Sequence, residues 1–158
     1  APTPRSVVLT GIVASASLRA LLPATLLLTV AFALGVHWPG FEELGLAAVL
    51  VMGFAAASAC WAIVVALRFR TQQAAPIMQV VTFTAVLFTT AYAPKALLSD
   101  WLRPIATANP VTLILEGIRQ GFVGGLSWDD TGPALLAVVG LVAALGALAI
   151  RGMLRQGI

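Results

Sequence analysis

The chain has 158 residues, of which 60% are hydrophobic and 9% are charged, and its formal net charge is +3. Roughly a quarter of the residues of an ordinary soluble domain are charged, so this composition cannot cover a surface that faces water, and a soluble globular protein is excluded. We therefore expect an all-α polytopic membrane helix bundle whose outer surface meets hydrocarbon. The single cysteine, Cys60, excludes a disulfide framework.

Four apolar stretches are long enough to cross a bilayer, which takes about 20 residues. The expected spans are residues 19–36, 44–67, 74–94 and 131–150. The first is only just long enough, and its length becomes comfortable if Arg19 is its cytoplasmic anchor, with the aliphatic stem along the helix and the guanidinium at the headgroups. Residues 1–18 are then a cytoplasmic or interfacial segment that leads into this span.

The charged residues divide between the two sides that these spans define. One side receives only arginines, namely Arg5, Arg19, Arg68, Arg70, Arg151 and Arg155. The other side receives all six acidic residues together with Lys95, Arg103 and Arg119. Because cytoplasmic loops carry an excess of Lys and Arg, we expect the arginine side, with both ends of this chain, to be cytoplasmic. The basic composition therefore indicates topology. The sequence has no basic stripe interleaved with stacking aromatics, so it does not predict nucleic-acid binding.

The third expected span carries a polar stripe. At 100° per residue, six side chains fall within an arc of about 120°, and these are Gln79, Thr82, Phe83, Val86, Thr89 and Thr90. Such a face avoids lipid. It either forms hydrogen bonds to neighbouring helices or lines a path for an amphipathic substrate.

Residues 95–130 follow on the outer side as an expected external helical hairpin. Its first helix is predicted around Leu97, Leu98, Trp101 and Leu102, with Pro104 as its end. Asn109 as N-cap and Pro110 at the first position predict the second helix. Its apolar side holds Val111, Ile114, Leu115 and Ile118. We expect this hairpin to lie on or dip into the outer leaflet.

The sequence gives only weak indications of helix contacts and none of a catalytic or metal site. Gly53 with Ala57, and Gly140 with Ala144, have the spacing of small residues at helix contacts. The sequence has no glycine-rich phosphate loop, no metal-ligand spacing and no Ser, His and Asp set, so we expect no catalytic residue and no metal site. No Asp, Glu or Lys lies within a span, which argues against a proton-driven carrier, whereas sodium coupling through backbone carbonyls stays open.

The chain contains the stretches Phe88 to Pro94, Trp101 with Leu102, Ile105 with Ala106, Asn109 to Thr112 and Glu116 to Arg119. In these stretches it resembles the type-2 ABC transporter permeases, in particular the daunorubicin-resistance-like exporters of drugs and lipids. Weaker similarity lies at Thr3 to Arg5 and at Arg68 with Gln72 to Ala74. Asp100 replaces the proline that is common before the tryptophan. Because the first two of the usual six spans are absent, we interpret residues 1–158 as one transmembrane permease domain, a fragment holding its C-terminal two-thirds.

The resemblance implies the permease subunit of an ATP-driven exporter of hydrophobic or amphipathic drugs or lipids. The chain would bind no cofactor, with ATP and Mg on a partner ABC ATPase, and a second permease half would complete the path through the lipid. ATPase-coupling residues are expected at Thr3, Pro4, Arg5, Arg68, Arg70, Gln72 and Gln73. The hairpin is expected to act as a gate through Pro94, Trp101, Asn109, Pro110, Glu116 and Arg119.

Abundant alanine, and arginine in place of lysine, favour a bacterium with a GC-rich genome and hence the bacterial inner membrane. Two alternatives of other classes stay open, a membrane scaffold or assembly subunit that transports nothing, and an ion-coupled secondary carrier.

Overall fold

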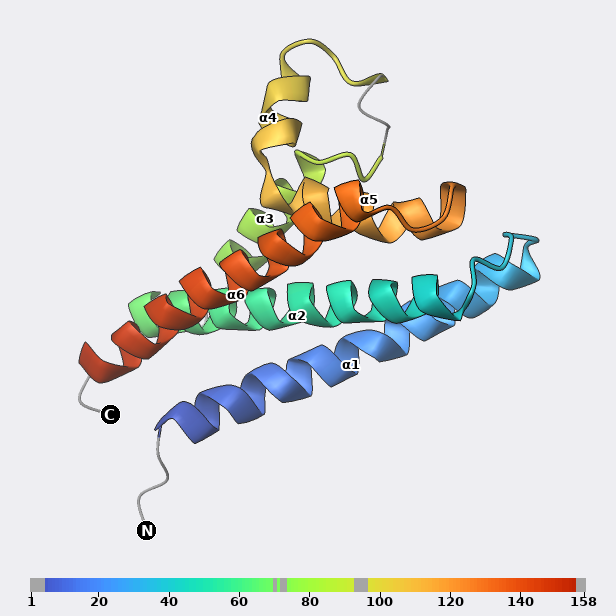
Figure 1. Ribbon diagram of the computed structural model, residues 1–158. Coiled ribbons are helices and arrows are strands. Elements are labelled where there is room, and N and C mark those ends of the chain that lie inside the picture. Colours follow the sequence, from blue (N-terminus) through green and yellow to red (C-terminus); the bar gives the residue numbers. More distant parts are fainter. Residues whose placement is uncertain (1–4, 70, 72–73, 93–96, 156–158) are drawn as a thin grey trace.

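The computed structural model describes residues 5–69, 71, 74–92 and 97–155, which form helices and turns (Figure 1). The helices are α1 Arg5–Ala33, α2 Phe41–Phe69, α3 Ala74–Leu87, α4 Leu102–Ala108, α5 Pro110–Val123 and α6 Trp128–Arg155. Since no strand occurs among these residues, the all-α prediction is confirmed.

Three of the helices are long and apolar enough to cross a membrane. The candidate spans are Val7–Ala33, Phe41–Phe69 and Trp128–Arg155, with 27, 29 and 28 residues. At 1.5 Å per residue each extends about 40 Å, more than the hydrocarbon core of about 30 Å. α2 packs against both α1 and α6, so the three form one bundle (Figure 1). The protein is a multi-pass membrane protein.

The charges of α2 and α6 lie at their two ends. Their first turns hold Glu42 with Glu43 and Asp129 with Asp130, and their last turns hold Arg68 and Arg155. This arrangement complements the helix dipole. The last turns of α2 and α6 are neighbours, since a Cβ on Gly152 would lie 3.0 Å from Leu67 Cδ1, and α1 begins at the same end of the bundle (Figure 1). The expected division of charges therefore holds for these helices.

α1 is one continuous helix, without a break between the expected lead-in at residues 1–18 and the expected span at 19–36. Its apolar stretch begins at Val7. Arg19 is therefore near the middle of α1, and its role as an anchor at the start of the first span stays a prediction.

α3 is shorter than the expected span at residues 74–94. It has 14 residues and ends at Leu87, and residues 88–92 form turns and bends. The Thr89 hydroxyl accepts a hydrogen bond from Ala91 N at 3.1 Å, a local bond that competes with helix continuation. Fourteen residues rise about 21 Å, less than the hydrocarbon core, so a fourth crossing stays a prediction.

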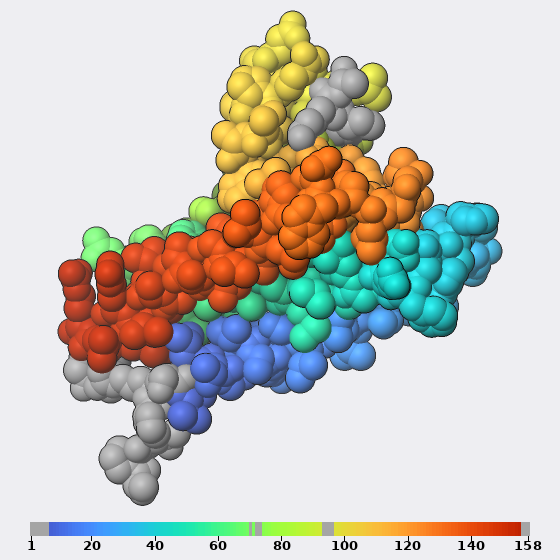
Figure 2. All heavy atoms as spheres, viewed as in Figure 1, coloured from blue at the N-terminus to red at the C-terminus, as the bar shows by residue number. Residues whose placement is uncertain are grey.

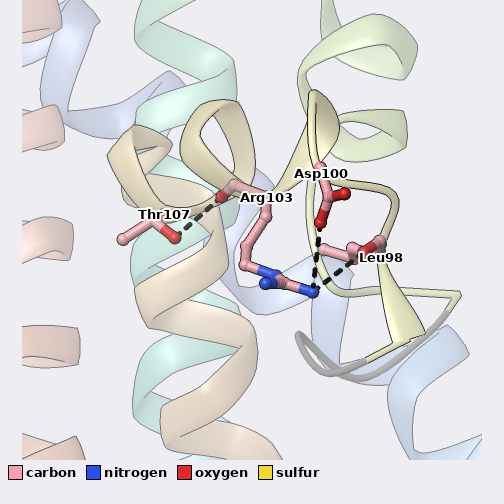
Figure 3. A network of polar contacts seen from close by, with 4 residues as sticks. All are labelled: Leu98, Asp100, Arg103 and Thr107. Carbon is pink, nitrogen blue, oxygen red and sulfur yellow. Dashed lines mark hydrogen bonds and ion pairs between the residues drawn. The ribbon is translucent and has the colours of Figure 1, made fainter.

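α4 begins later than the predicted first helix of the hairpin. Asp100 and Trp101 form a turn, and Pro104 lies inside the first turn of α4 and does not end a helix. A proline is tolerated there because the N–H it lacks would have no helical partner. Arg103 donates to Leu98 O at 3.3 Å and lies 3.9 Å from the exposed Asp100 carboxylate, and the Thr107 hydroxyl donates to Arg103 O (Figure 3). These contacts hold the start of α4, which projects from the bundle (Figure 2).

α5 packs inside the bundle, against α2 and α6. Its Ile114 forms the buried core with Leu50, Ala134 and Val138. Its buried face holds Val111, Thr112, Ile114, Gly117, Gln120 and Gly121. The predicted apolar side was therefore right at Val111 and Ile114, which are buried, and at Ile118, which is half-buried and packs against the core. Leu115 is half-buried. The face that packs most closely is built from small residues, which periodicity of large apolar side chains does not reveal.

Candidate functional site

Asn109 joins the end of α3 to the start of α5. Its Nδ2 donates to Ala85 O at 2.7 Å and to Phe88 O at 3.1 Å. Its Oδ1 accepts from Val111 N at 3.0 Å, which is the N-cap bond predicted from the sequence. The last carbonyls and the first amides of helices have no partner within their own helix. One side chain therefore satisfies unpaired groups of two helices, and we call Asn109 with these three bonds the α3–α5 clamp.

Arg119 also links α5 to the backbone that follows α3. Its guanidinium donates to the carbonyl oxygen of Thr90, in the turn that follows α3. The predicted pairing of Arg119 with Glu116 stays a prediction. The backbone after α3 is thus held by two side chains of the α5 segment.

The turn next to the clamp is tightly buried. Thr89, Thr90 and Thr112 are 2%, 0% and 0% exposed. The hydroxyls of Thr90 and Thr112 have no hydrogen-bond partner within the part of the chain that the structure describes. Buried polar groups are nearly always paired, so these two hydroxyls are exceptions at this junction.

A cavity of about 150 Å³ borders the clamp, between α2, α3, α5 and α6. Ala85 and Val111, which both bond to Asn109, are part of its wall. The remaining wall includes Phe54, Ser58, Trp61, Thr82 and Leu141. The indole N–H of Trp61 is buried and has no acceptor among the described residues. An apolar wall with a few polar groups is typical of ligand sites, although this space is smaller than a drug-sized pocket of about 300 Å³ or more.

Four of the predicted substrate-path residues lie on one side of α3 but differ in burial. Thr82 lines the cavity, while Gln79 and Phe83 are exposed and Val86 is half-buried. Thr89 and Thr90 lie beyond the end of α3, so the helical spacing that joined them to the stripe does not apply. Their role in a path stays a prediction, and the cavity adds wall residues from α2 that the stripe did not include.

The predicted coupling residues are described only in part. Thr3, Pro4, Arg70, Gln72 and Gln73 lie outside the described residues. Arg5 opens α1, and Arg68 is exposed in the last turn of α2 at the same end of the bundle (Figure 1). The coupling role of this end stays a prediction.

Of the predicted gate residues, Pro94 is outside the described residues and Glu116 is half-buried on α5. The others lie around the end of α3. Trp101 is exposed, and its ring packs edge-on to Phe88 with centroids 6.5 Å apart. Pro110 is the first residue of α5, where its fixed φ suits a helix start. The structure thus brings Trp101, Asn109 and Arg119 to one segment, residues 85–90.

Sequence reasoning missed Gln120, the most connected side chain of α5. Its Nε2 donates to Thr131 Oγ1 at 2.7 Å and to Gly117 O at 3.1 Å, and its Oε1 accepts from Ser127 N at 2.8 Å. These bonds hold the loop between α5 and α6. The sequence did contain a signal for this role. Gln120 is three residues after Gly117 and six after Ile114, so its polar amide lies on a helix face otherwise lined by apolar or small residues.

We expect Gln120→Leu to lower the free energy of unfolding by about 2 kcal/mol, because it leaves Thr131 and the Ser127 amide without their partners. Unfolding of the purified protein in detergent measures this change. Gln79→Leu is the matched control, since Gln79 is exposed on α3. Equal stability of the two variants would show that the Gln120 bonds contribute nothing.

A protein-family model described as ABC-2 type transporter matches residues 1–123, which end with the last residue of α5. The chain belongs to the ABC-2 type transporter family. Searches of curated proteins and of solved structures return no match. The family confirms the coarser part of the resemblance seen in the sequence: this is the permease domain of an ABC transporter. An ABC-2 permease works with an ABC ATPase, which is where ATP hydrolysis takes place. The clamp residue Asn109 and Arg119 both lie within the matched region.

Proposed function

We propose that this ABC-2 permease is the membrane part of an exporter for hydrophobic or amphipathic compounds such as drugs or lipids. It would act in a bacterial inner membrane with both ends of this chain in the cytoplasm, paired with a second permease half. The observation that carries the choice of substrate class is the cavity at the clamp, whose wall is apolar apart from Ser58, Thr82 and the Trp61 N–H.

In this proposal α2 connects the end of the bundle that would contact the ATPase with the core around α5. Its Arg68 end would contact the ATPase, and near its other end Leu50 packs against α5 at Gly117. A nucleotide shifts a conformational equilibrium only by its differential affinity for the two states. Movement of α2 as a rigid helix would therefore reach α5, and through the clamp it would reach the end of α3.

Reconstitution with the partner ATPase tests this function against the alternatives. We expect export that stops without ATP and continues after the proton and sodium gradients are collapsed. Export that requires an ion gradient would favour a secondary carrier. Failure to copurify with any ATPase or to change its hydrolysis rate would favour a scaffold.

The coupling end has its own prediction. Changing Arg68 and Arg70 together to Glu is expected to reduce ATP-driven export about 10-fold or more, because it reverses the charge of the loop proposed to contact the ATPase, or to misorient the spans. Export assays with site-directed labelling separate these outcomes.

Arg151→Glu with Arg155→Glu is the matched control, since it makes the same charge change on the same side, at the end of α6. Unchanged export and topology in the Arg68 and Arg70 variant would refute the assignment of this loop.

A further inference from the structure

The cavity beside the clamp lies between four helices in the apolar part of the bundle. The residues that α2 contributes have spacings of three and four, which places them on one side of that helix. They are Phe54, Ala57, Ser58 and Trp61. At 1.5 Å per residue, Trp61 is about 10 Å before Arg68 along α2, and Phe54 is about 16 Å beyond the acidic residues of the first turn. The cavity is therefore away from both charged ends of α2.

The wall of this cavity is suited to an uncharged group. None of the described wall residues is charged. The Thr82 hydroxyl donates to Met78 O at 2.8 Å within α3, and the Trp61 N–H is covered by protein atoms, so neither offers its hydrogen to a ligand. The Ser58 hydroxyl is neutral and cannot balance a full charge. An ammonium or a carboxylate would lose its hydration here without gaining a partner, so the cavity excludes charged groups.

The volume of the cavity, about 150 Å³, suits a single ring. Apolar protein cavities of about this volume stay free of water and bind benzene. The room comes from small side chains, Ala57 of α2 and Ala85 of α3, among larger wall residues such as Phe54 and Leu141. An empty space of this size costs stability because its lining lacks contacts, and a ring that fills the space supplies those contacts.

We propose that this cavity binds an uncharged six-membered ring of the exported compound and that occupancy of the cavity stabilises the α3–α5 clamp. The inference rests on the proposed export function and narrows its substrate class to compounds that carry such a ring. Ala85 and Val111 both line the cavity, and Asn109 bonds to the backbone of both. A ring in the cavity therefore contacts α3 and α5 where the clamp joins them. Because coupling between two sites is reciprocal, loss of the clamp weakens binding of the ring.

The first test measures binding by fluorine NMR, with the whole permease and its ATPase in lipid nanodiscs. Two probes share one ring and differ in charge, para-fluorotoluene and para-fluorobenzylammonium. We expect the protein to cause saturable line broadening of para-fluorotoluene, beyond that caused by nanodiscs without protein. The ammonium probe should show none, because the cavity holds no counter-charge for it.

Variants of the wall show where the probe binds. Ala85→Leu fills the cavity from α3 and should weaken binding of para-fluorotoluene about 10-fold or more. Ala75→Leu, the same change at an exposed position of α3, should leave binding unchanged. Ala85→Leu combined with Leu145→Ala returns volume from the α6 wall, so it should recover part of the affinity and shows that the filled protein still folds.

The link to the clamp has its own variant. The Asn109 side chain is not part of the described wall, yet Asn109→Ala should weaken binding of para-fluorotoluene about 3-fold or more because it loosens α3 from α5. Wild-type affinity in this variant would overturn the link between the cavity and the clamp.

Three results would overturn the binding site itself. These are broadening by the wild-type protein no greater than by empty nanodiscs, equal binding by the Ala85→Leu and Ala75→Leu variants, and equal binding of the ammonium probe. The export function is tested separately. ATP-driven export of hydrophobic compounds without probe binding would keep the function and remove this site. Probe binding by a protein that exports nothing with ATP would keep the site and remove the function.

Discussion

Replacing Asn109 with alanine is expected to lower the free energy of unfolding by about 2 to 3 kcal/mol and to loosen the end of α3 from α5. The substitution removes two bonds to the Ala85 and Phe88 carbonyls and the cap on Val111 N. Each intramolecular hydrogen bond contributes about 0.5 to 1.5 kcal/mol net, and a lost N-cap costs about 1 kcal/mol. Unfolding in detergent gives the stability change, and the export assay gives its effect on transport.

Two further variants separate the two halves of the clamp. Asn109→Ser keeps a cap oxygen for Val111 N but loses the donor to α3, so we expect it to recover part of the loss. Asn109→Asp keeps the cap oxygen and turns a carboxylate toward two carbonyl oxygens, so it should be at least as damaging as alanine. An aspartate variant with wild-type stability would show that the bonds to Ala85 and Phe88 do not hold α3.

The long helices α2 and α6 were predictable because sequence and structure use the same signals there. An apolar run between acidic residues at one end and arginines at the other both specifies a span and complements the helix dipole. Glu43 and Arg68 mark α2 in this way. No tertiary contact is needed for such a prediction.

The boundaries of α1 and α3 were not predictable by the same rule. The helix that contains the expected first span begins well before Arg19, because backbone bonds and packing on α2 continue a helix and an exposed charge interrupts neither. The end of α3 is set at Thr89 and Thr90, where a local hydroxyl bond and burial against α5 replace helix continuation. An apolar run does not reveal either effect.

The site shows the same limit. The Asn109 cap follows from local sequence, because Val111 is two residues away. Its bonds to Ala85 and Phe88 join residues 24 and 21 positions apart, and the Arg119 bond to Thr90 joins residues 29 apart. One sequence contains no register between α3 and α5, so the clamp became visible only in three dimensions.

Of the two predicted small-residue contacts, the structure shows one and not the other. Gly53 does approach Val138 closely, as expected. At Gly140, however, a Cβ would meet nothing within 4 Å. The tight contact that the spacing rule missed is Gly117, where a Cβ would lie 2.5 Å from Ala134 Cβ and 3.1 Å from Leu50 Cδ1.

The same substitution at Gly117 and Gly140 is therefore expected to have opposite effects. Alanine is better than glycine in a helix interior by up to about 1 kcal/mol, and at the open Gly140 this gain should appear as higher stability. At Gly117 the added methyl must move α6 away from α5 at the buried core, and overpacking of this kind costs about 1 to 3 kcal/mol. Gly117→Ala should therefore lower stability despite the better helix propensity.

Unfolding of both variants under the same detergent conditions makes this comparison. Leu50 can yield because its Cδ1 is the end of a flexible side chain, whereas Ala134 Cβ moves only with the backbone of α6. Gly117→Ala combined with Ala134→Gly should consequently recover most of the lost stability, while Leu50→Ala should not, because it opens a cavity in the core cluster. If Gly117→Ala is as stable as Gly140→Ala, α5 and α6 do not pack as closely as the structure places them.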